Sequence, residues 1–472
     1  MYIQTKRNIN NKQTKQMFTR KIRSAALLLT LAFIPFSGVL AQATTPLSLK
    51  EALNYALENY SEARKAKLDI ENAGYQIQEV RSRALPQVNG NGGLNYNPLL
   101  QMSALPGELN AADPGKTLLV AFGQKWNANI GVNVSQNIFD MSVFTGLKAA
   151  KSTREFYQLN AQLTEEKVLE TVATTYYQVL IQQQHIVNID SNISTTEKTQ
   201  KIIQGLYESG LGKKIDVDRL EVKLLNLQSQ RRQLMNAVSQ FENQLKFFIG
   251  MPVEQQITIV PEDHSNLNFS EALIEENADS ITRSELLVLE KQQQLLQLKK
   301  QSVKAEYYPT LALSGSYSYQ GLGNTFPIFK GIDKGANWFD VATVGLNLRI
   351  PLFNGNATRA RVNQAEVDIK KLQEDISQTK QSINLDFENA KKQISNSIIV
   401  LNTQEKNTEL AEKVMDNTSN NYKQGLATLT DLLDAQNALF EARNAYNSSL
   451  LDYRLAEVKL TKAKGQLRSL LN

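Results

Sequence analysis

The sequence predicts a mainly α-helical, exported protein that contributes four strands to a membrane β-barrel. Three observations support this fold class: a leader that is first basic and then apolar, motifs that recur in two halves of the chain, and four strand-like segments between very long helical patterns. Four strands cannot close a barrel, and a membrane tolerates no open sheet edge. We therefore expect several copies of the chain to build one barrel.

Residues 1–41 form a predicted signal peptide. Seven basic residues precede an apolar stretch from Ala25 to Leu40, and small residues before the bond between Ala41 and Gln42 favour cleavage there. The stretch has about 15 residues, whereas a spanning helix needs about 20, which argues against a membrane anchor. The leader has no acidic residue, so its removal leaves 45 basic and 47 acidic residues. The mature chain therefore has no excess of basic residues that would indicate a nucleic-acid partner.

The residue types present argue against an enzyme, a metal site and a bound cofactor. There is no cysteine, which excludes disulfides, thiolate ligands and a cysteine nucleophile. His185 and His264 have no partners at metal-ligand or catalytic-triad spacing, and no phosphate-binding glycine loop is present. No segment after residue 41 is apolar for 18 residues, so we expect any membrane entry to be made by strands.

The chain is a predicted two-fold repeat. Residues 207–210 correspond to residues 422–425, Asp216 to Asp431 and Gly250 to Gly465, all at an offset of 215 residues. The first repeat is expected over residues 42–250 and the second over residues 268–472. A polar linker, residues 251–267, joins them in what we expect to be an equatorial region.

Each half should begin with a helix that ends before a proline. The first is predicted from Ser48 to Leu85, because Ser48 and Glu51 can form a capping box and Pro86 follows. Its counterpart is predicted from Ser270 to Tyr308, before Pro309.

Two strands follow the first helix in each half. Apolar residues alternate with Asn, Ser, Gly or Thr, and aromatic residues lie near the strand ends. The segments are Val88–Tyr96, Trp126–Gln136, Leu311–Tyr319 and Asp340–Ile350. A half-buried sheet of a soluble domain alternates in the same way, but four strands in an exported chain of long helices favour the membrane.

The helices after the strands are too long for a globular domain. Residues 143–207 and 357–422 contain no proline, and about 65 residues span roughly 100 Å as a helix. The last helix has a strict heptad of large residues from Leu432 to Leu460 and a parallel row of small residues from Ala435 to Ala463. Closely packed antiparallel helices, curved into a tube, are predicted.

Glycine-containing breaks separate each long helix from the next. They lie at residues 209–212 and 424–427, and Asp216 and Asp431 follow near the next helix N-terminus, with Asp434 one turn further. Helix capping is the simplest role for these aspartates. In a symmetric oligomer Asp431 and Asp434 would also form rings of carboxylates.

Together these features resemble the TolC family of outer-membrane efflux proteins, over essentially the whole mature chain. The most specific motif is the run from Tyr422 to Ala435. The resemblance implies a homotrimer, with a twelve-stranded barrel in the outer membrane and an α-helical tunnel through the periplasm. It implies a channel that passively conducts substrates for a periplasmic adaptor protein and an inner-membrane pump of the RND or ABC type, in efflux or type I secretion.

The resemblance also assigns roles to residues at the helix breaks. Asp431 and Asp434 would form the constricting rings of a periplasmic gate that also contains Asp216 and Tyr422. The tips that receive the adaptor would be Ser209, Gly210, Leu211, Gly425 and Leu426. Ala427 and Ile215 depart from the family pattern of a basic and a hydroxyl residue, and Lys213 or Lys214 is a conjectural substitute for the missing cation.

An exported structural coiled-coil protein or adhesin without a transport role is the alternative. It would explain the heptads and leave the four alternating strands unexplained.

Overall fold

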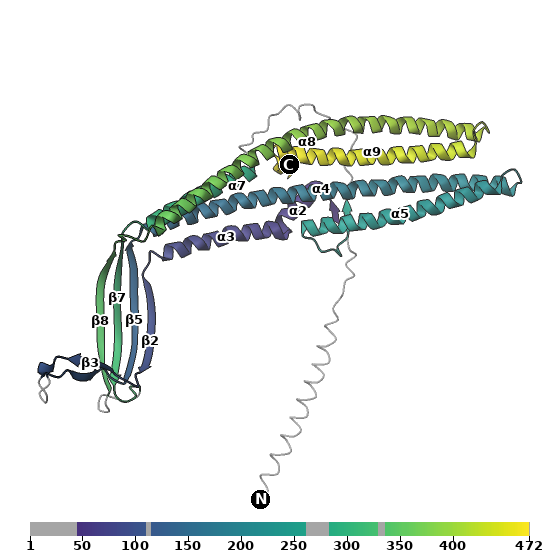
Figure 1. The fold of residues 1–472 in the computed structure, drawn as a ribbon. Coiled ribbons are helices and arrows are strands. Elements are labelled where there is room, and N and C mark those ends of the chain that lie inside the picture. The colour runs from purple at the N-terminus through teal and green to yellow at the C-terminus, as the bar shows by residue number, and fades with distance from the viewer. Residues whose placement is uncertain (1–44, 110–114, 261–282, 329–335, 472) are drawn as a thin grey trace, which may run out of the picture. The chain divides into compact units, whose positions relative to one another are not determined.

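A computed structural model describes residues 45–109, 115–260, 283–328 and 336–471 (Figure 1). The predicted signal peptide and its cleavage site at Ala41 and Gln42 lie outside these residues. Two short strands, β1 (Thr45–Leu47) and β6 (Ile257–Ile259), pair with each other. Among the described residues, 45–46 and 254–258 form a separate small unit, and the others form one unit of helices and a sheet.

The first predicted helix is two helices. They are α2 (Leu49–Asn59) and α3 (Ser61–Ser82), and the predicted capping box of Ser48 and Glu51 is present. The continuous helix to Leu85 was therefore wrong: at Tyr60 the backbone is extended. The Tyr60 ring packs edge-on against Phe247 and Phe248, with ring centroids 6.2 Å apart in both pairs. The break between α2 and α3 thus lies where Tyr60 contacts the end of a helix that is distant in the sequence and contains Phe247 and Phe248.

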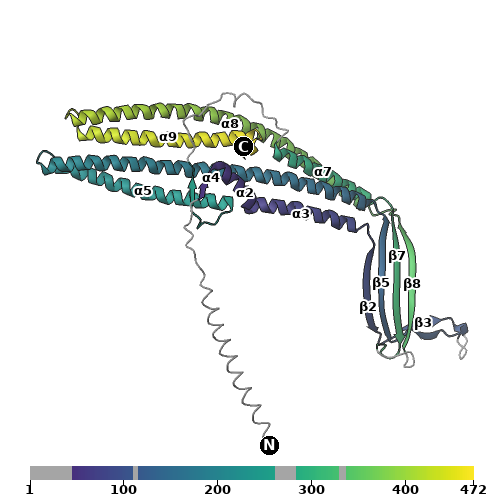
Figure 2. The same cartoon turned by 180° about the vertical axis from the view of Figure 1, so that it is seen from behind.

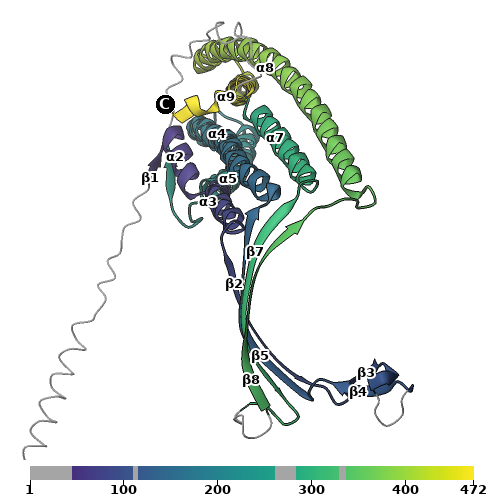
Figure 3. The ribbon, with the colours of Figure 1, turned by 90° about the vertical axis from the view of Figure 1, so that its left-hand side faces the viewer.

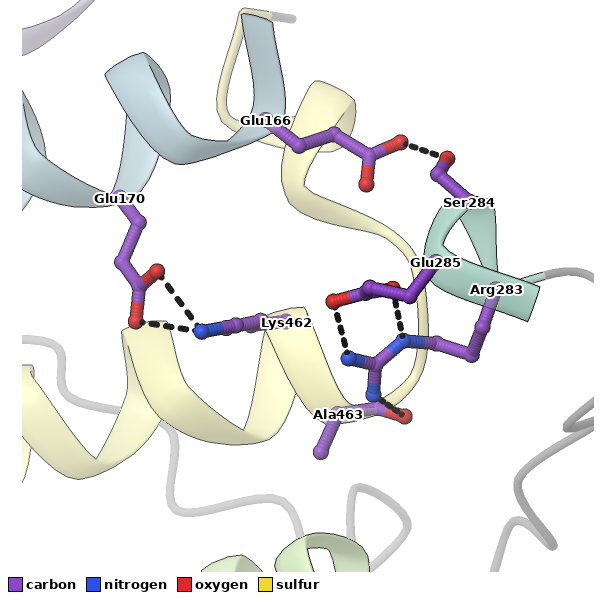
Figure 4. A network of polar contacts seen from close by, with 7 residues as sticks. All are labelled: Glu166, Glu170, Arg283, Ser284, Glu285, Lys462 and Ala463. Carbon is purple, nitrogen blue, oxygen red and sulfur yellow. Dashed lines mark hydrogen bonds and ion pairs between the residues drawn. The ribbon is translucent and has the colours of Figure 1, made fainter. Parts of the chain in front are cut away.

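The counterpart in the second half is α7 (Ser284–Ala305), which begins after an extended Arg283. The prediction of one continuous helix from Ser270 to Tyr308 was therefore wrong, because the backbone at Arg283 is not helical. Residues 270–282 lie outside the described residues. Arg283 is buried, and Figure 4 shows its side chain between Glu285 and Ala463. Its guanidinium donates to Glu285 Oε1 at 2.8 Å and to the Ala463 carbonyl at 3.2 Å.

A second set of contacts in Figure 4 fixes α7 and the final helix against the first long helix. Ser284 Oγ donates to Glu166 Oε1 at 2.6 Å. Lys462 Nζ lies 2.9 Å from Glu170 Oε2.

The four predicted strands form one antiparallel sheet in the order β2-β5-β7-β8 (Figure 2). Their bounds are Gln87–Tyr96, Trp126–Phe139, Thr310–Gly323 and Ala336–Arg349. The register places Val88 beside Val134, Val134 beside Gly315, and Gly315 beside Val344, so apolar and small residues share one face. Asparagine and serine side chains share the other face.

The polar face is internally hydrogen-bonded. Asn133 Nδ2 donates to Asn91 Oδ1 at 3.0 Å, and Asn347 Nδ2 donates to Ser314 Oγ at 2.8 Å. The predicted alternation is therefore confirmed across all four strands. Within this sheet β2 and β8 each pair on one side only.

The structure contains a hairpin that the sequence did not predict. β3 (Gln101–Leu105) and β4 (Leu118–Phe122) pair with each other and project from the end of the sheet far from the helices (Figure 3).

The long helices extend as predicted. α4 (Met141–Glu208) and α5 (Lys214–Ile249) form one antiparallel hairpin, and α8 (Ala357–Lys423) and α9 (Leu429–Ala463) form a second (Figure 1). α4 also packs against α9, and α3 and α7 pack against α4. In the part of the chain that the structure describes, no helix has the length and apolarity needed to cross a membrane.

The heptad of α9 is buried as predicted. Leu432, Tyr453 and Leu460 of the large row are nearly inaccessible. The small row is buried throughout: Ala435, Ala442, Ser449, Ala456 and Ala463. Small side chains allow close helix approach, so this row accounts for the tight packing of α9.

Candidate functional site at the hairpin ends

The ends of the two long hairpins are built alike. At the first, Gly210 N–H donates to the Tyr207 carbonyl and Leu211 N–H to the Leu206 carbonyl. At the second, Gly425 N–H donates to the Tyr422 carbonyl and Leu426 N–H to the Asn421 carbonyl. Both pairs form the Schellman arrangement that satisfies the last carbonyls of a helix.

Glycine is required at both turns, because φ is 75° at Gly210 and 73° at Gly425. The residue after a Schellman glycine often packs back on its own helix. Here Leu211 is 81% exposed and Leu426 is 75% exposed. Each hairpin end therefore presents a leucine to its surroundings, beside Ser209 at the first end.

Asp431 is a helix cap in this structure. Its carboxylate accepts hydrogen bonds from Thr428 Oγ1 at 2.7 Å and from Thr428 N–H at 2.8 Å, and Asp431 N–H donates to Thr428 Oγ1 at 3.2 Å. The side-chain hydrogen bond, and then the backbone one, hold the pKa of Asp431 below its usual value. The side chain is exposed.

Asp216 and Tyr422 come from different hairpins, Asp216 from α5 and Tyr422 from α8. Burial raises the pKa of the Tyr422 hydroxyl, and the negative charge of Asp216 raises it further. Asp216 also pairs with Arg219 on its own helix at 3.6 Å. The structure thus brings together two of the four predicted gate residues, while Asp431 and Asp434 lie on the exposed side of α9.

An apolar cluster joins the two hairpins just behind their ends. Its buried members are Ile203 of α4, Leu220 of α5, and Leu429 and Leu432 of α9, and the Tyr422 side chain packs against them. All four long helices therefore meet in one small core at this end.

A cavity of about 700 Å³ lies beside this core. It is lined by the apolar side chains of Ile202, Leu206, Met415, Ala427 and Leu432, by Tyr422, and by polar side chains that include Thr199, Lys423 and Gln436. Ile215, the other departure from the family pattern, is exposed. Neither Ala427 nor Ile215 can donate a side-chain hydrogen bond.

Sequence reasoning missed a polar connection behind the apolar core. Lys223 Nζ of α5 donates to Gln436 Oε1 of α9 at 3.3 Å, and Gln436 Nε2 donates to Thr199 Oγ1 of α4 at 3.4 Å. In a single sequence these are ordinary polar residues on long helices, and only a change of polarity within the heptad rows could have drawn attention to them. Among the described residues, no three His, Asp or Glu side chains gather as a metal site would require.

Comparison with known proteins gives a consistent family match. The family described as Outer membrane efflux protein matches residues 52–251 and 281–466. Outer membrane protein TolC of Vibrio cholerae is 23% identical over 433 residues, which are 91% of this chain and 93% of that protein.

The alkaline protease secretion protein AprF of Pseudomonas aeruginosa is 21% identical over 458 residues, covering 93% of this chain and 89% of that protein. Among solved structures, the outer membrane protein VceC of Vibrio cholerae superposes with a TM-score of 0.66 at 15% identity. That superposition covers 88% of this chain and 96% of VceC, and it confirms the predicted fold of the single chain.

Proposed function

The chain belongs to the outer membrane efflux protein family, and on that premise we propose that it is one subunit of a homotrimeric channel that conducts substrates passively. Its role is that of an outer-membrane channel in an efflux or secretion system, like its relatives TolC and AprF. The observation that carries the proposal is the four-stranded sheet with two open edges, which continues into helices of 68 and 67 residues.

The open sheet edges support assembly. β2 and β8 would leave backbone N–H and C=O groups unpaired in a membrane, which has no water to satisfy them. Pairing β8 of one copy with β2 of the next satisfies both edges, and three copies close a twelve-stranded barrel. The face with Val134 and Val344 would contact lipid, and the face with Asn91 and Asn133 would line the lumen.

The helices have open edges as well. α5, α4, α9 and α8 pack in that order, so α5 and α8 are the outer helices of the layer. Apolar residues are exposed on both, including Val222 and Leu225 on α5 and Leu385, Ile399 and Leu410 on α8. Neighbouring copies of the chain would cover these residues and continue the layer into a tube.

The hairpin ends would form the periplasmic gate. In a trimer, Asp431 and Asp434 would each occur three times around the axis and form acidic rings at the entrance. Asp216 and Tyr422 would hold the α4–α5 and α8–α9 hairpins close to each other. Movement of the hairpins apart would widen the rings.

A periplasmic adaptor protein would bind at the same ends. Leu211 and Leu426 offer exposed apolar contacts, and Ser209, Gly210 and Gly425 shape the turns that carry them. The apolar cavity between α4 and α8 offers a recess beside these turns. An inner-membrane pump of the RND or ABC type would supply the substrate through the adaptor, and a signal peptide ending at Ala41 would direct export.

Reconstitution tests the proposed function. Protein extracted from outer membranes should migrate as a trimer on a denaturing gel before heating and as a monomer after it. The same trimer should conduct ions in planar lipid bilayers. A trimer without conductance would support the alternative of an exported structural protein, and an unheated monomer would contradict the assembly.

A further inference from the structure

Lys223 is a half-buried lysine that reaches from one hairpin to the other. It lies on α5, and its Nζ donates to Gln436 Oε1 on α9 at 3.3 Å. Burial lowers the pKa of Lys223, while the negative charge of Asp434 raises it in opposition. The lysine therefore has two partners on α9, one by hydrogen bond and one by charge.

Gln436 passes the connection on to α4. Its side chain is only 4% exposed, and its Nε2 donates to Thr199 Oγ1 at 3.4 Å. Thr199 Oγ1 donates in turn to the Thr195 carbonyl at 3.0 Å. The amide of Gln436 thus has its oxygen and its nitrogen engaged by two helices of the opposite hairpin.

The surroundings make this connection sensitive to hairpin separation. Lys223 lies about one turn from Leu220, and Gln436 one turn from Leu432, and both leucines belong to the apolar core that joins the hairpins. A buried polar group that loses its partner without gaining water is strongly disfavoured. Separation of α5 from α9 would break the hydrogen bond from Lys223 and leave the Gln436 oxygen, on a side chain that is only 4% exposed, without this partner.

The four residues discussed above at the turns do not supply this link. Ala427 and Ile215 have apolar side chains, and Lys213 and Lys214 are exposed beside the turn. The connection is also present in one half only. At the offset of 215 residues, Lys223 corresponds to Ala438, Gln436 to Glu221 and Thr199 to Val414.

We propose that Lys223 is a positioning residue that holds the two hairpins of one protomer in the closed arrangement through Gln436 and Thr199. The inference rests on the proposed channel function, because it concerns the closed state of that channel.

A double-mutant cycle in the assembled trimer tests the hydrogen bond. Lys223→Met and Gln436→Leu should each raise the ratio of open to closed time in planar bilayers by about tenfold, as expected for loss of a hydrogen bond to a charged group. The double variant should exceed the single variants only slightly, because both remove the same contact. The conservative variant Lys223→Arg should keep the ratio of open to closed time close to that of the wild type.

Two further variants separate this role from general loss of stability. Lys214→Met removes an exposed lysine nearby and should leave gating unchanged. Gln436→Glu turns the hydrogen bond into an ion pair and should make openings rarer than in the wild type. Fully additive effects of Lys223→Met and Gln436→Leu, or gating like the wild type in both, would overturn the inference.

The proposed function can fail separately. A wild-type trimer that never conducts would refute the channel itself. If the wild-type trimer conducts and replacement of Asp431 and Asp434 opens it, but Lys223→Met leaves gating unchanged, the channel function stands and only the role of Lys223 is refuted.

Discussion

Asp431 combines two roles that a motif alone cannot separate. Its carboxylate closes the capping box with Thr428 and is also a predicted member of the constriction. Because hydrogen bonding lowers its pKa, the stabilisation it gives to the start of α9 is present above the ordinary carboxyl pKa. That stabilisation is lost as the pH falls through the lowered value. Asp434, one turn further, lies outside the capping box, so its replacement leaves the start of α9 capped.

The first prediction concerns these two carboxylates. Asp434→Ala should raise single-channel conductance and weaken block by multivalent cations about tenfold, the loss expected for a charge-assisted contact. Combining it with Asp431→Ala should increase both effects. Asp431→Asn is the matched control, since it removes the charge and keeps an oxygen that can accept from Thr428. Unchanged conductance and unchanged block in the double variant would remove both residues from the constriction.

At this scale the sequence identified the residues at the helix breaks but not their contacts. The turn glycines and Asp431 follow from local spacing, because capping and helix ends depend on neighbours in sequence. The gate role expected for Tyr422 came from the family resemblance. The link from Lys223 to Gln436 joins positions 213 residues apart. It depends on which face of α5 meets α9, and one sequence does not determine that.

The same limit explains the missed break between α2 and α3. The local pattern from Ser48 to Leu85 contains a start signal and an end signal with nothing helix-breaking between them. The break at Tyr60 coincides with the end of α5, where Gly250 has φ of 76° and approaches the Asn59 backbone closely. Long elements were predictable from periodicity, and this interruption was not, because its cause lies in tertiary packing.

The second prediction compares two glycines with nearly the same backbone conformation. A side chain at Gly210 would meet nothing within 4 Å, whereas a Cβ at Gly250 would lie 2.6 Å from the Asn59 carbonyl oxygen. Gly210→Ala should therefore cost about 1–2 kcal/mol of backbone strain. Gly250→Ala should cost that strain and about 1–3 kcal/mol more for the clash. Thermal unfolding of the trimer measures both, and equal shifts in melting temperature would contradict the close contact at Asn59.

The third prediction concerns the start of α7. Burial alone would raise the pKa of Glu285, but hydrogen bonds from the Arg283 guanidinium and from the Glu285 backbone, with the Arg283 and Lys462 charges, outweigh it and lower that pKa. The stability that this carboxylate contributes is present above its ordinary pKa and is lost as the pH falls through the lowered value.

Arg283→Met should therefore destabilise the trimer near neutral pH and do so less at acidic pH, where Glu285 is protonated. The cost should be about 2 kcal/mol, below the full cost of breaking a buried ion pair, because Glu285 is partly exposed. Adding Glu285→Gln to Arg283→Met should recover part of the lost stability. Melting temperatures measured from neutral to acidic pH provide the test, and a pH-independent effect of Arg283→Met would contradict the role of the ion pair.

For the whole molecule, the sequence predicted the class of architecture because its signals are periodic and long. Alternation over 9 or more residues determined the strands, and the heptad from Leu432 to Leu460 determined the packing of α9. The β3–β4 hairpin gave no such signal, because residues 118–122 form an unbroken apolar run with no polar face. Assembly could be argued only from what one chain leaves open, namely the edges of the sheet and of the helix layer.

The last prediction tests that assembly through the two faces of the sheet. Val344 is 81% exposed in the single chain, although it is apolar, so membrane lipid should cover it in the trimer. Asn133 lies on the opposite face and should meet water in the lumen. The chain has no cysteine, so Val344→Cys and Asn133→Cys each introduce a single thiol per protomer.

A charged, water-soluble thiol reagent should label Asn133→Cys and reduce its conductance, and it should leave Val344→Cys unlabelled until detergent is added. A lipid-soluble maleimide should label Val344→Cys in the membrane. Reversed labelling would mean that the sheet is inverted relative to the membrane. Equal labelling of both positions by the charged reagent would mean that neither face contacts lipid, and the barrel would then have no apolar surface with which to remain in the outer membrane.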